Sequence, residues 1–270
     1  AFIMKPAQEE FEANQAVREA EQQTGPTVAS DAPAIAEIKP VEEALQDDAR
    51  VPFDAASVDG SIRLAGSRID DLSLKKHYLT VDKEQEVRLF RPENTEFGYF
   101  ATWYWADGSK LVAGRNSPWS QVGEGQLTPG NPLILRLETE GLVIDRVISV
   151  DEDYLFTFTD TVTNNSGEAR QLRAIGSIER HGDYKEFLET TDPGSSAKNG
   201  LAHMGLMGVV NGELRLKKYK PLFQLKDIKG ETSEGTFPSS QGGWWGLSDM
   251  YWLGALVPQQ DAFFAGLVDK

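Results

Sequence analysis

Side chains of alternating polarity run through much of this chain, and they restrict its fold more than any other feature of the sequence. One run has larger side chains at every second position, namely Leu142, Ile144, Arg146, Ile148 and Val150. The polar turn Asp151-Glu152-Asp153 separates it from a second alternating run between Tyr154 and Val162. Because successive side chains of a β-strand point to opposite faces, the two runs predict a β-hairpin.

Short segments of the same kind recur from Val51 onward, rich in β-branched and aromatic residues and bounded by turn residues. They are residues 61–74, 87–90, 97–106, 133–138, 172–178, 201–210, 213–219, 251–257 and 262–268. No long segment with helical periodicity lies between them, so a parallel sheet, which needs crossover helices, is not expected. No internal repeat suggests a propeller. The sequence therefore predicts an all-β fold, a sandwich of antiparallel sheets with little helix.

The first fifty residues differ in composition from the rest. Residues 7–49 contain eleven acidic and two basic residues, and Phe11 is their only aromatic side chain. Such a segment cannot bury enough apolar surface to offset the entropy lost on ordering. Residues 7–50 are therefore predicted to be an acidic flexible linker, with an unrelated tail as the alternative. Residues 1–6 place three large apolar residues before a lysine and a proline, which fits either the end of an apolar helix or no role.

The overall charge and the missing cysteines exclude several functions. The chain has 27 lysines and arginines against 42 aspartates and glutamates, a net charge of −15. A nucleic-acid partner is therefore not expected, and on this overall balance anionic lipid headgroups are disfavoured too. The absence of cysteine excludes disulfides, thiolate nucleophiles and cysteine-ligated zinc. No apolar run is long enough to span a bilayer unaided.

Two carboxylate clusters could in principle perform acid–base chemistry. Asp70 and Asp71 are adjacent, so on a strand they would point to opposite faces and could not share a pocket. The other cluster, residues 151–153, lies in the predicted hairpin turn, where solvated acids are usual. Both clusters are interpreted as structural.

Three widely separated histidines give an alternative function. His181 and His203, with Glu179 or Asp183, could form the acid and base of a carbohydrate-binding or aldose-epimerase-like sandwich. His77 has no such neighbour. We favour the simpler interpretation of histidines at strand ends with ordinary hydrogen bonds. Since no phosphate loop, nucleophile elbow or metal-spacing motif occurs, the sequence predicts no catalytic residue, no metal and no cofactor.

Tryptophans supply the candidate contact surface. Trp103 and Trp105 share one strand face, and Trp119 follows. A second group lies beside Gly242-Gly243 and consists of Trp244, Trp245, Tyr251 and Trp252. Aromatic clusters usually belong to a core, but they also form binding surfaces. The second group is the predicted site of contact with a partner or substrate.

Three segments together resemble a known family. They are residues 66–78 (GSRIDDLSLKKHY), 146–160 (RVISVDEDYLFTFTD) and 242–258 (GGWWGLSDMYWLGALVP). In this order they resemble the large periplasmic domain of the bacterial membrane protein insertase YidC, in its alphaproteobacterial form. The resemblance covers most of residues 51–258.

This resemblance implies a fold and a cellular setting. The fold would be a β-supersandwich like that of galactose mutarotases, formed by residues 51–270 and cut short at its C-terminal end. Residues 1–6 would be the exit of a first transmembrane helix, and the membrane contact would be made through helices that this chain lacks. The domain would lie in the periplasm, at the bacterial inner membrane. It would be a non-catalytic scaffold whose partners are the Sec translocon with its accessory subunits and nascent inner-membrane proteins.

Overall fold

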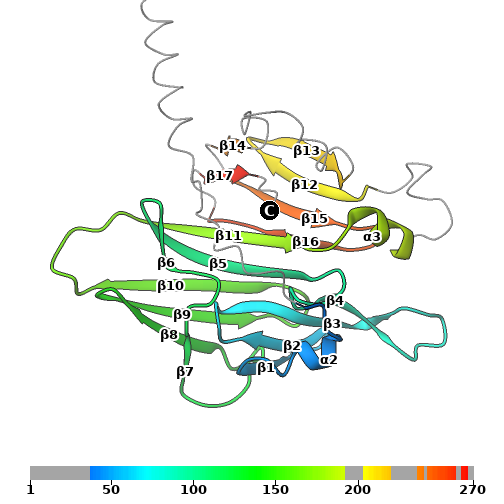
Figure 1. Cartoon of the computed structure of the whole chain (residues 1–270), viewed down its shortest axis with the longest axis horizontal. Coiled ribbons are helices and arrows are strands. Elements are labelled where there is room, and N and C mark those ends of the chain that lie inside the picture. The colour runs from blue at the N-terminus through cyan, green and yellow to red at the C-terminus, as the bar shows by residue number, and fades with distance from the viewer. Residues whose placement is uncertain (1–36, 192–202, 220–235, 240–241, 260–262, 267–270) are drawn as a thin grey trace, which may run out of the picture.

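The computed structural model describes residues 37–191, 203–219, 236–239, 242–259 and 263–266, and nearly all of its regular structure is β (Figure 1). Two helices are described, α2 (Val41–Ala44) and α3 (Tyr184–Thr191). The strands are β1 (Arg50–Asp54), β2 (Val58–Arg63), β3 (Arg68–Tyr78), β4 (Glu86–Phe90), β5 (Tyr99–Asp107), β6 (Lys110–Ala113), β7 (Ser120–Val122), β8 (Leu133–Thr139), β9 (Leu142–Val150), β10 (Phe156–Asn164), β11 (Leu172–Arg180), β12 (Gly205–Val210), β13 (Glu213–Lys218), β14 (Thr236–Ser239), β15 (Gly243–Ser248), β16 (Leu253–Leu256) and β17 (Phe263–Gly266).

Two antiparallel sheets form the main sandwich. The larger has seven strands, in the order β1-β2-β3-β5-β11 with β4 beside β3 and β6 beside β5, and the smaller has the order β10-β9-β8-β7. Their facing side chains make one core, in which Ile62 and Ile69 of the larger sheet meet Ile144 and Ile148 of the smaller, all at most 2% exposed. Burial of these alternating apolar rows is the main force that holds the two sheets together.

A charged pair lies within this core. Arg146 is fully buried in the alternating row of β9 and makes two hydrogen bonds to Asp160, its register partner on β10 (2.8 and 2.7 Å). Trp105 donates a third hydrogen bond to the same carboxylate (2.7 Å), and the guanidinium lies 4.5 Å from the ring centre of Trp119. These contacts satisfy the carboxylate and stabilise the buried charge.

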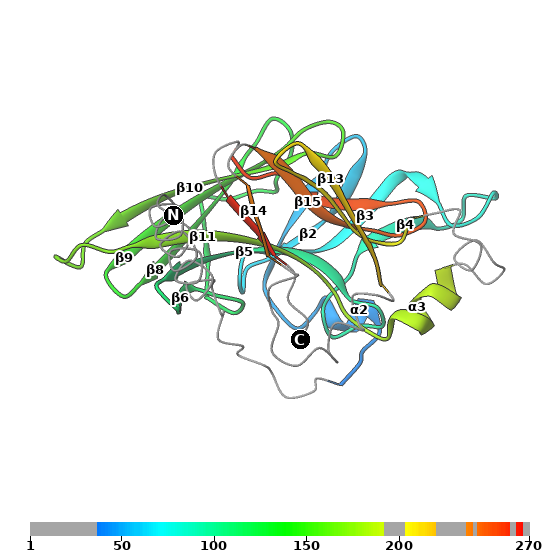
Figure 2. The ribbon, with the colours of Figure 1, turned by 90° about the horizontal axis from the view of Figure 1, so that it is seen from above.

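A further four-stranded sheet, β13-β12-β15-β16, lies above β11 and β5 in Figure 1 and in front of the larger sheet in Figure 2. The hydroxyl of Tyr99 links the two bodies, because it donates to the carbonyl of Leu247 on β15 (2.8 Å) and accepts from the amide of Gly254 on β16 (3.1 Å). Arg180 of β11 stacks on Tyr99 (3.9 Å) and on Phe187 of α3 (4.2 Å). The inner face of this sheet is thereby fixed against the sandwich.

The all-β antiparallel sandwich with little helix is confirmed, while the closer likeness to galactose mutarotases stays a prediction. The predicted hairpin is β9–β10, paired from Val150↔Phe156 to Leu142↔Asn164. The single strand predicted over residues 61–74 is wrong, because a turn divides it into the end of β2 and most of β3. Gly66 and Ser67 adopt left-handed backbone conformations in that turn (φ 81° and 51°), which a continuous strand does not accommodate.

Part of the predicted linker is folded. The amide of Lys39 donates to the carbonyl of Asn94 (2.8 Å), Ala44 of α2 is buried, and Asp48 pairs with Arg63 (2.7 Å). These contacts hold residues 37–49 against the sandwich, so a flexible linker does not extend to residue 50. The remainder of that prediction, and residues 1–6, lie outside the described residues. In the described part of the chain, no helix has the length and apolar character needed to cross a membrane.

Candidate functional site

The structure divides the predicted aromatic site among four environments. Trp244 and Trp245 are neighbours on β15 and point to opposite faces of the sheet. Trp245 faces inward against the smaller core cluster and lies over Gly208, where an added Cβ would stand 2.2 Å from the indole ring. Trp252 packs against the main core and makes an edge contact with His77 (4.7 Å between ring centres). Tyr251 lies in a turn and is 75% exposed. The four side chains therefore do not form one surface.

Trp244 belongs instead to an apolar sheet face that points away from the sandwich. Pairing places Leu214, Val209 and Trp244 in one row across β13, β12 and β15, and Leu216, Met207, Gly246 and Ala255 in the next. Leu214 is 60% exposed, Leu216 48% and Leu253 41%. We call this surface the outer face; it consists of Met207, Val209, Leu214, Leu216, Trp244, Leu253, Ala255 and Val257.

The charge of this sheet is opposite to that of the whole chain. Its four strands contain one acidic residue, Glu213, and three basic residues, Arg215, Lys217 and Lys218, all on the edge strand β13. Glu213 pairs with Arg215. Within the described residues, neither Lys217 nor Lys218 has an acidic partner. Alternation along β13 places Lys218 on the side of Leu214 and Leu216, whereas Glu213, Arg215 and Lys217 lie on its other side.

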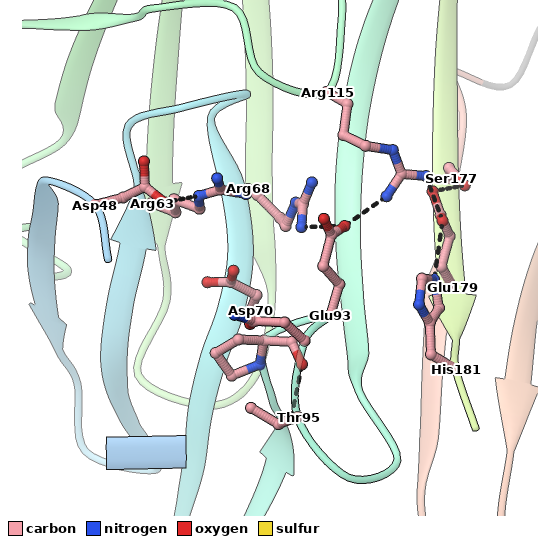
Figure 3. Close-up of polar contacts among 12 residues, drawn as sticks. Asp48, Arg63, Arg68, Asp70, Glu93, Thr95, Arg115, Ser177, Glu179 and His181 are labelled. Carbon is pink, nitrogen blue, oxygen red and sulfur yellow. Dashed lines mark hydrogen bonds and ion pairs between the residues drawn. The ribbon is translucent and has the colours of Figure 1, made fainter. Parts of the chain in front are cut away.

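A network of ion pairs on the larger sheet involves two of the other candidates, Glu179 and His181 (Figure 3). Glu93 accepts from Arg68 and from Arg115 (both 2.7 Å), and Arg115 also donates to Glu179 (2.6 Å). Arg68 is fully buried, with its guanidinium 4.4 Å from the ring centre of Phe100. His181 reaches Glu179 at 3.5 Å.

The electrostatics of this network favour the charged form of Glu93. Burial acts to raise the pKa of Glu93, but Arg68 and Arg115 outweigh it and hold that pKa below its ordinary value. Burial and the neighbouring Glu179 carboxylate raise the pKa of Tyr104 to about 12. A general acid or base needs a pKa near the working pH. The network is therefore suited to fixing β3, β5 and β11 relative to one another, not to proton transfer.

The other candidates for the epimerase-like alternative lie in separate settings. His203 donates from Nε2 to the carbonyl of Leu206 at the start of β12 (2.9 Å). Asp183 accepts from the amides of Lys185 and Glu186 (2.8 and 3.1 Å), so it caps the N-terminus of α3. No polar contact joins His203 to His181 or Glu179 in the described part of the chain, and the geometry gives this alternative no support.

The two carboxylate clusters make contacts within the fold, and their structural role stays a prediction. Asp70 is buried beside Arg50 (2.8 Å), and burial raises its pKa, whereas Asp71 on the opposite face accepts from Ser61 (2.7 Å). Residues 151–153 are exposed in the β9–β10 turn, where Asp151 accepts from the amide of Asp153 (2.9 Å). Among the described residues, no group of three or more side chains is arranged to hold a metal ion.

Sequence reasoning missed most of the outer face and the arginines of the network. A signal for the outer face was present in the segment ELRLKK of β13, where leucine alternates with arginine and lysine. Such a segment predicts a strand with one apolar and one basic side. The network has no comparable signal, since Arg115 and Glu179 are 64 residues apart in the chain.

The fold and its surfaces define an antiparallel β-sandwich domain with an exposed apolar sheet face. A model of the YidC periplasmic domain family matches residues 50–268. The chain belongs to the YidC periplasmic domain family. This membership agrees with the prediction that the domain is not an enzyme.

Relatives from alphaproteobacteria carry the name Membrane protein insertase YidC. The chain is 33% identical over 276 residues to the one from Cereibacter sphaeroides (strain ATCC 17029 / ATH 2.4.9), covering 98% of this chain and 42% of that protein. It is 35% identical over 270 residues to that of Maricaulis maris (strain MCS10), covering 97% and 43%. It is 35% identical over 230 residues to that of Brucella suis biovar 1 (strain 1330), covering 83% and 35%. The chain thus spans about two fifths of the length of these first two relatives.

Proposed function

We propose that this chain is the periplasmic part of a membrane protein insertase of the bacterial inner membrane, where it serves as a non-catalytic scaffold. The observation that carries the proposal is the family match across residues 50–268, together with relatives named as insertases. The ion-paired Glu93 supports a scaffold, since a carboxylate whose pKa two arginines hold below its ordinary value is a poor acid and a poor base at neutral pH.

The outer face is the contact surface in this proposal, and Trp244 is the one residue of the predicted aromatic site that lies on it. An exposed apolar sheet face of this kind is typical of a surface that binds something. Its partners would be nascent inner-membrane proteins and the Sec translocon with its accessory subunits. Trp245 and Trp252 would support this surface from behind, because both pack against core residues.

An insertion assay tests the proposal. Cells depleted of the native insertase would receive the full-length protein with Trp244→Ser and Leu216→Ser, and protease protection of a Sec-dependent and a Sec-independent reporter would be measured. We expect slower insertion of at least one reporter than with the unmodified protein.

The matched control is Ile134→Ser with Val147→Ser. These are register partners on β8 and β9, they are 39% and 37% exposed, and they lie on the solvent side of the smaller sheet. The control should insert both reporters at the normal rate. Normal insertion by the outer-face variant, or an equal defect in the control, would refute the role given to the outer face.

A further inference from the structure

We infer that the free edge of β10 docks a second copy of this chain, which adds its own β10 in antiparallel orientation and joins the two smaller sheets into one. Strand β10 lies at the edge of the smaller sheet, and in the described part of the chain only β9 pairs with it. The inference goes beyond the proposed function and does not depend on it.

Every second residue of β10 has its backbone amide and carbonyl pointing away from β9. At one end of the hairpin the amide of Asp151 donates to the carbonyl of Leu155 (3.1 Å). At the other end the amide of Asn165 donates to the carbonyl of Gly141 (2.7 Å). Because hydrogen-bonded pairs alternate along an antiparallel ladder, the odd-numbered residues of β10 bond β9. The even-numbered residues therefore direct their amides and carbonyls outward, and no hydrogen bond from a described residue reaches them.

Strand β10 lacks the features that usually protect a free edge. It pairs with β9 from Phe156 to Asn164 without a bulge. Its sequence, FTFTDTVTN, has no proline, lysine or glycine, and its four threonines are exposed on the solvent side. Other edge strands differ, because β7 has three residues and β13 has three basic side chains. Strand β10 is therefore a ready template for another strand.

The core is incompletely closed along this edge. Phe156, Phe158 and Val162 point inward from β10 and pack against the main core, but they are only partly buried. Their neighbours on β9, Ile144 and Ile148, are fully buried. An added strand with apolar inner side chains and uncharged polar outer side chains would cover the three residues and bond the free backbone groups.

Strand β10 itself has this pattern, so a second copy meets these requirements. Two antiparallel copies with Thr159 at a two-fold axis would set Thr157 of one opposite Thr161 of the other. The same alignment sets Phe156 opposite Val162 on the inner side. Pairs of threonines, and pairs of an aromatic with a β-branched residue, both stabilise adjacent strands. The edge is thus complementary to itself, as a two-fold contact requires.

The contact brings no unpaired charges together, although each chain carries −15. The only charged residue of β10 is Asp160, and Arg146 pairs with it through two hydrogen bonds (2.8 and 2.7 Å). An axis at Asp160 would set two carboxylates opposite each other, which disfavours that alignment. With the axis at Thr159, the acidic turn 151–153 lies beside residues 165–167 of the other copy, which carry no charge.

Disulfide cross-linking tests the inference, because the chain contains no cysteine and one introduced thiol reports one position. In Thr159→Cys the two thiols would face each other in a pair that is not hydrogen-bonded. The Cα atoms of such a pair lie about 4.5 Å apart, within the range of a disulfide. We expect mild oxidation of the purified 270-residue variant to give a linked dimer. The matched control is Thr163→Cys, exposed on the same strand but opposite Leu155 of the other copy, and it should stay largely monomeric.

Sedimentation velocity over a range of protein concentrations measures the association without cross-linking. We expect the unmodified chain to form a dimer as its concentration rises. Thr159→Lys with Thr161→Lys should abolish the dimer, because it sets lysines against one another along the edge. Ser120→Lys with Val122→Lys places the same charges on β7, at the opposite edge of the same sheet, and should leave the dimer unchanged. Circular dichroism would verify that every variant is folded.

Three results would overturn the inference. The first is a chain that stays monomeric at every concentration, whether or not an extended peptide binds to β10. The second is a Thr159→Cys variant that cross-links no faster than Thr163→Cys. The third is a dimer that survives the lysines on β10; if Leu214→Ser with Leu216→Ser then abolishes it, the contact belongs to the outer face.

Discussion

Replacing Tyr99 with phenylalanine removes one hydroxyl group from the junction between the sandwich and the sheet that carries the outer face. The ring is 2% exposed, and the hydroxyl bonds the carbonyl of Leu247 (2.8 Å) and the amide of Gly254 (3.1 Å). A buried polar group left without a partner costs about 1–3 kcal/mol. With two such groups, we expect Tyr99→Phe to lower the free energy of unfolding by on the order of 3 kcal/mol.

Urea denaturation followed by tryptophan fluorescence would measure this loss, and thermal melting should fall by roughly 2–4 °C for each kcal/mol. The amide of Gly254 should also exchange its hydrogen faster in the variant. Tyr251→Phe is the control, since that side chain is 75% exposed and its hydroxyl should contribute little. Leu247 and Gly254 face each other in the register of β15 and β16. If the two strands close and bond directly, the loss would be below about 1 kcal/mol, and the reasoning about the junction would be refuted.

Two further predictions concern buried charges. Asp160→Asn leaves the buried Arg146 without its counter-charge and should lower the free energy of unfolding, measured by urea denaturation, by about 3–5 kcal/mol. The control Asp145→Asn, in an exposed pair, should lower it by about 0–1 kcal/mol. Similar losses in the two variants would contradict the burial argument. Arginine neighbours hold the pKa of Glu93 below its ordinary value of 4.5, so its stabilising contribution is complete above that pH and is lost as the pH falls through the lower, folded-state pKa. Acid unfolding of Glu93→Gln should therefore show a shallower loss over this range, and an unchanged acid limb would contradict this assignment.

The sequence contains good information about strands and little about how the sheets associate. Alternation locates β8, β9 and β10 closely, because β8 and β9 bury every second side chain and those of β10 alternate between half-buried and exposed. The alternating pattern does not reveal the break within residues 61–74, since Leu64 continues it through a turn that depends on the backbone of Gly66 and Ser67.

The candidate site was predictable only in part. The division of Trp244 from Trp245 follows from strand geometry once β15 is recognised. That Trp245 faces the core and Trp244 faces outward depends on contacts with Gly208 and on the packing of β16 against β11. Contacts of that kind join distant segments, as the hydroxyl of Tyr99 does across 155 residues to Gly254, and no local pattern in the chain records them.

The buried pair of Arg146 and Asp160 has a consequence for how β9 finds its partner. A slip of one residue along β10 would turn the row of Ile144 and Ile148 toward water and carry the guanidinium away from Asp160, its carboxylate partner among the described residues. Apolar side chains alone tolerate such a shift more readily than an ion that must be neutralised. The pair therefore favours the observed register of β9 and β10, because a shifted register would leave a buried charge without its partner.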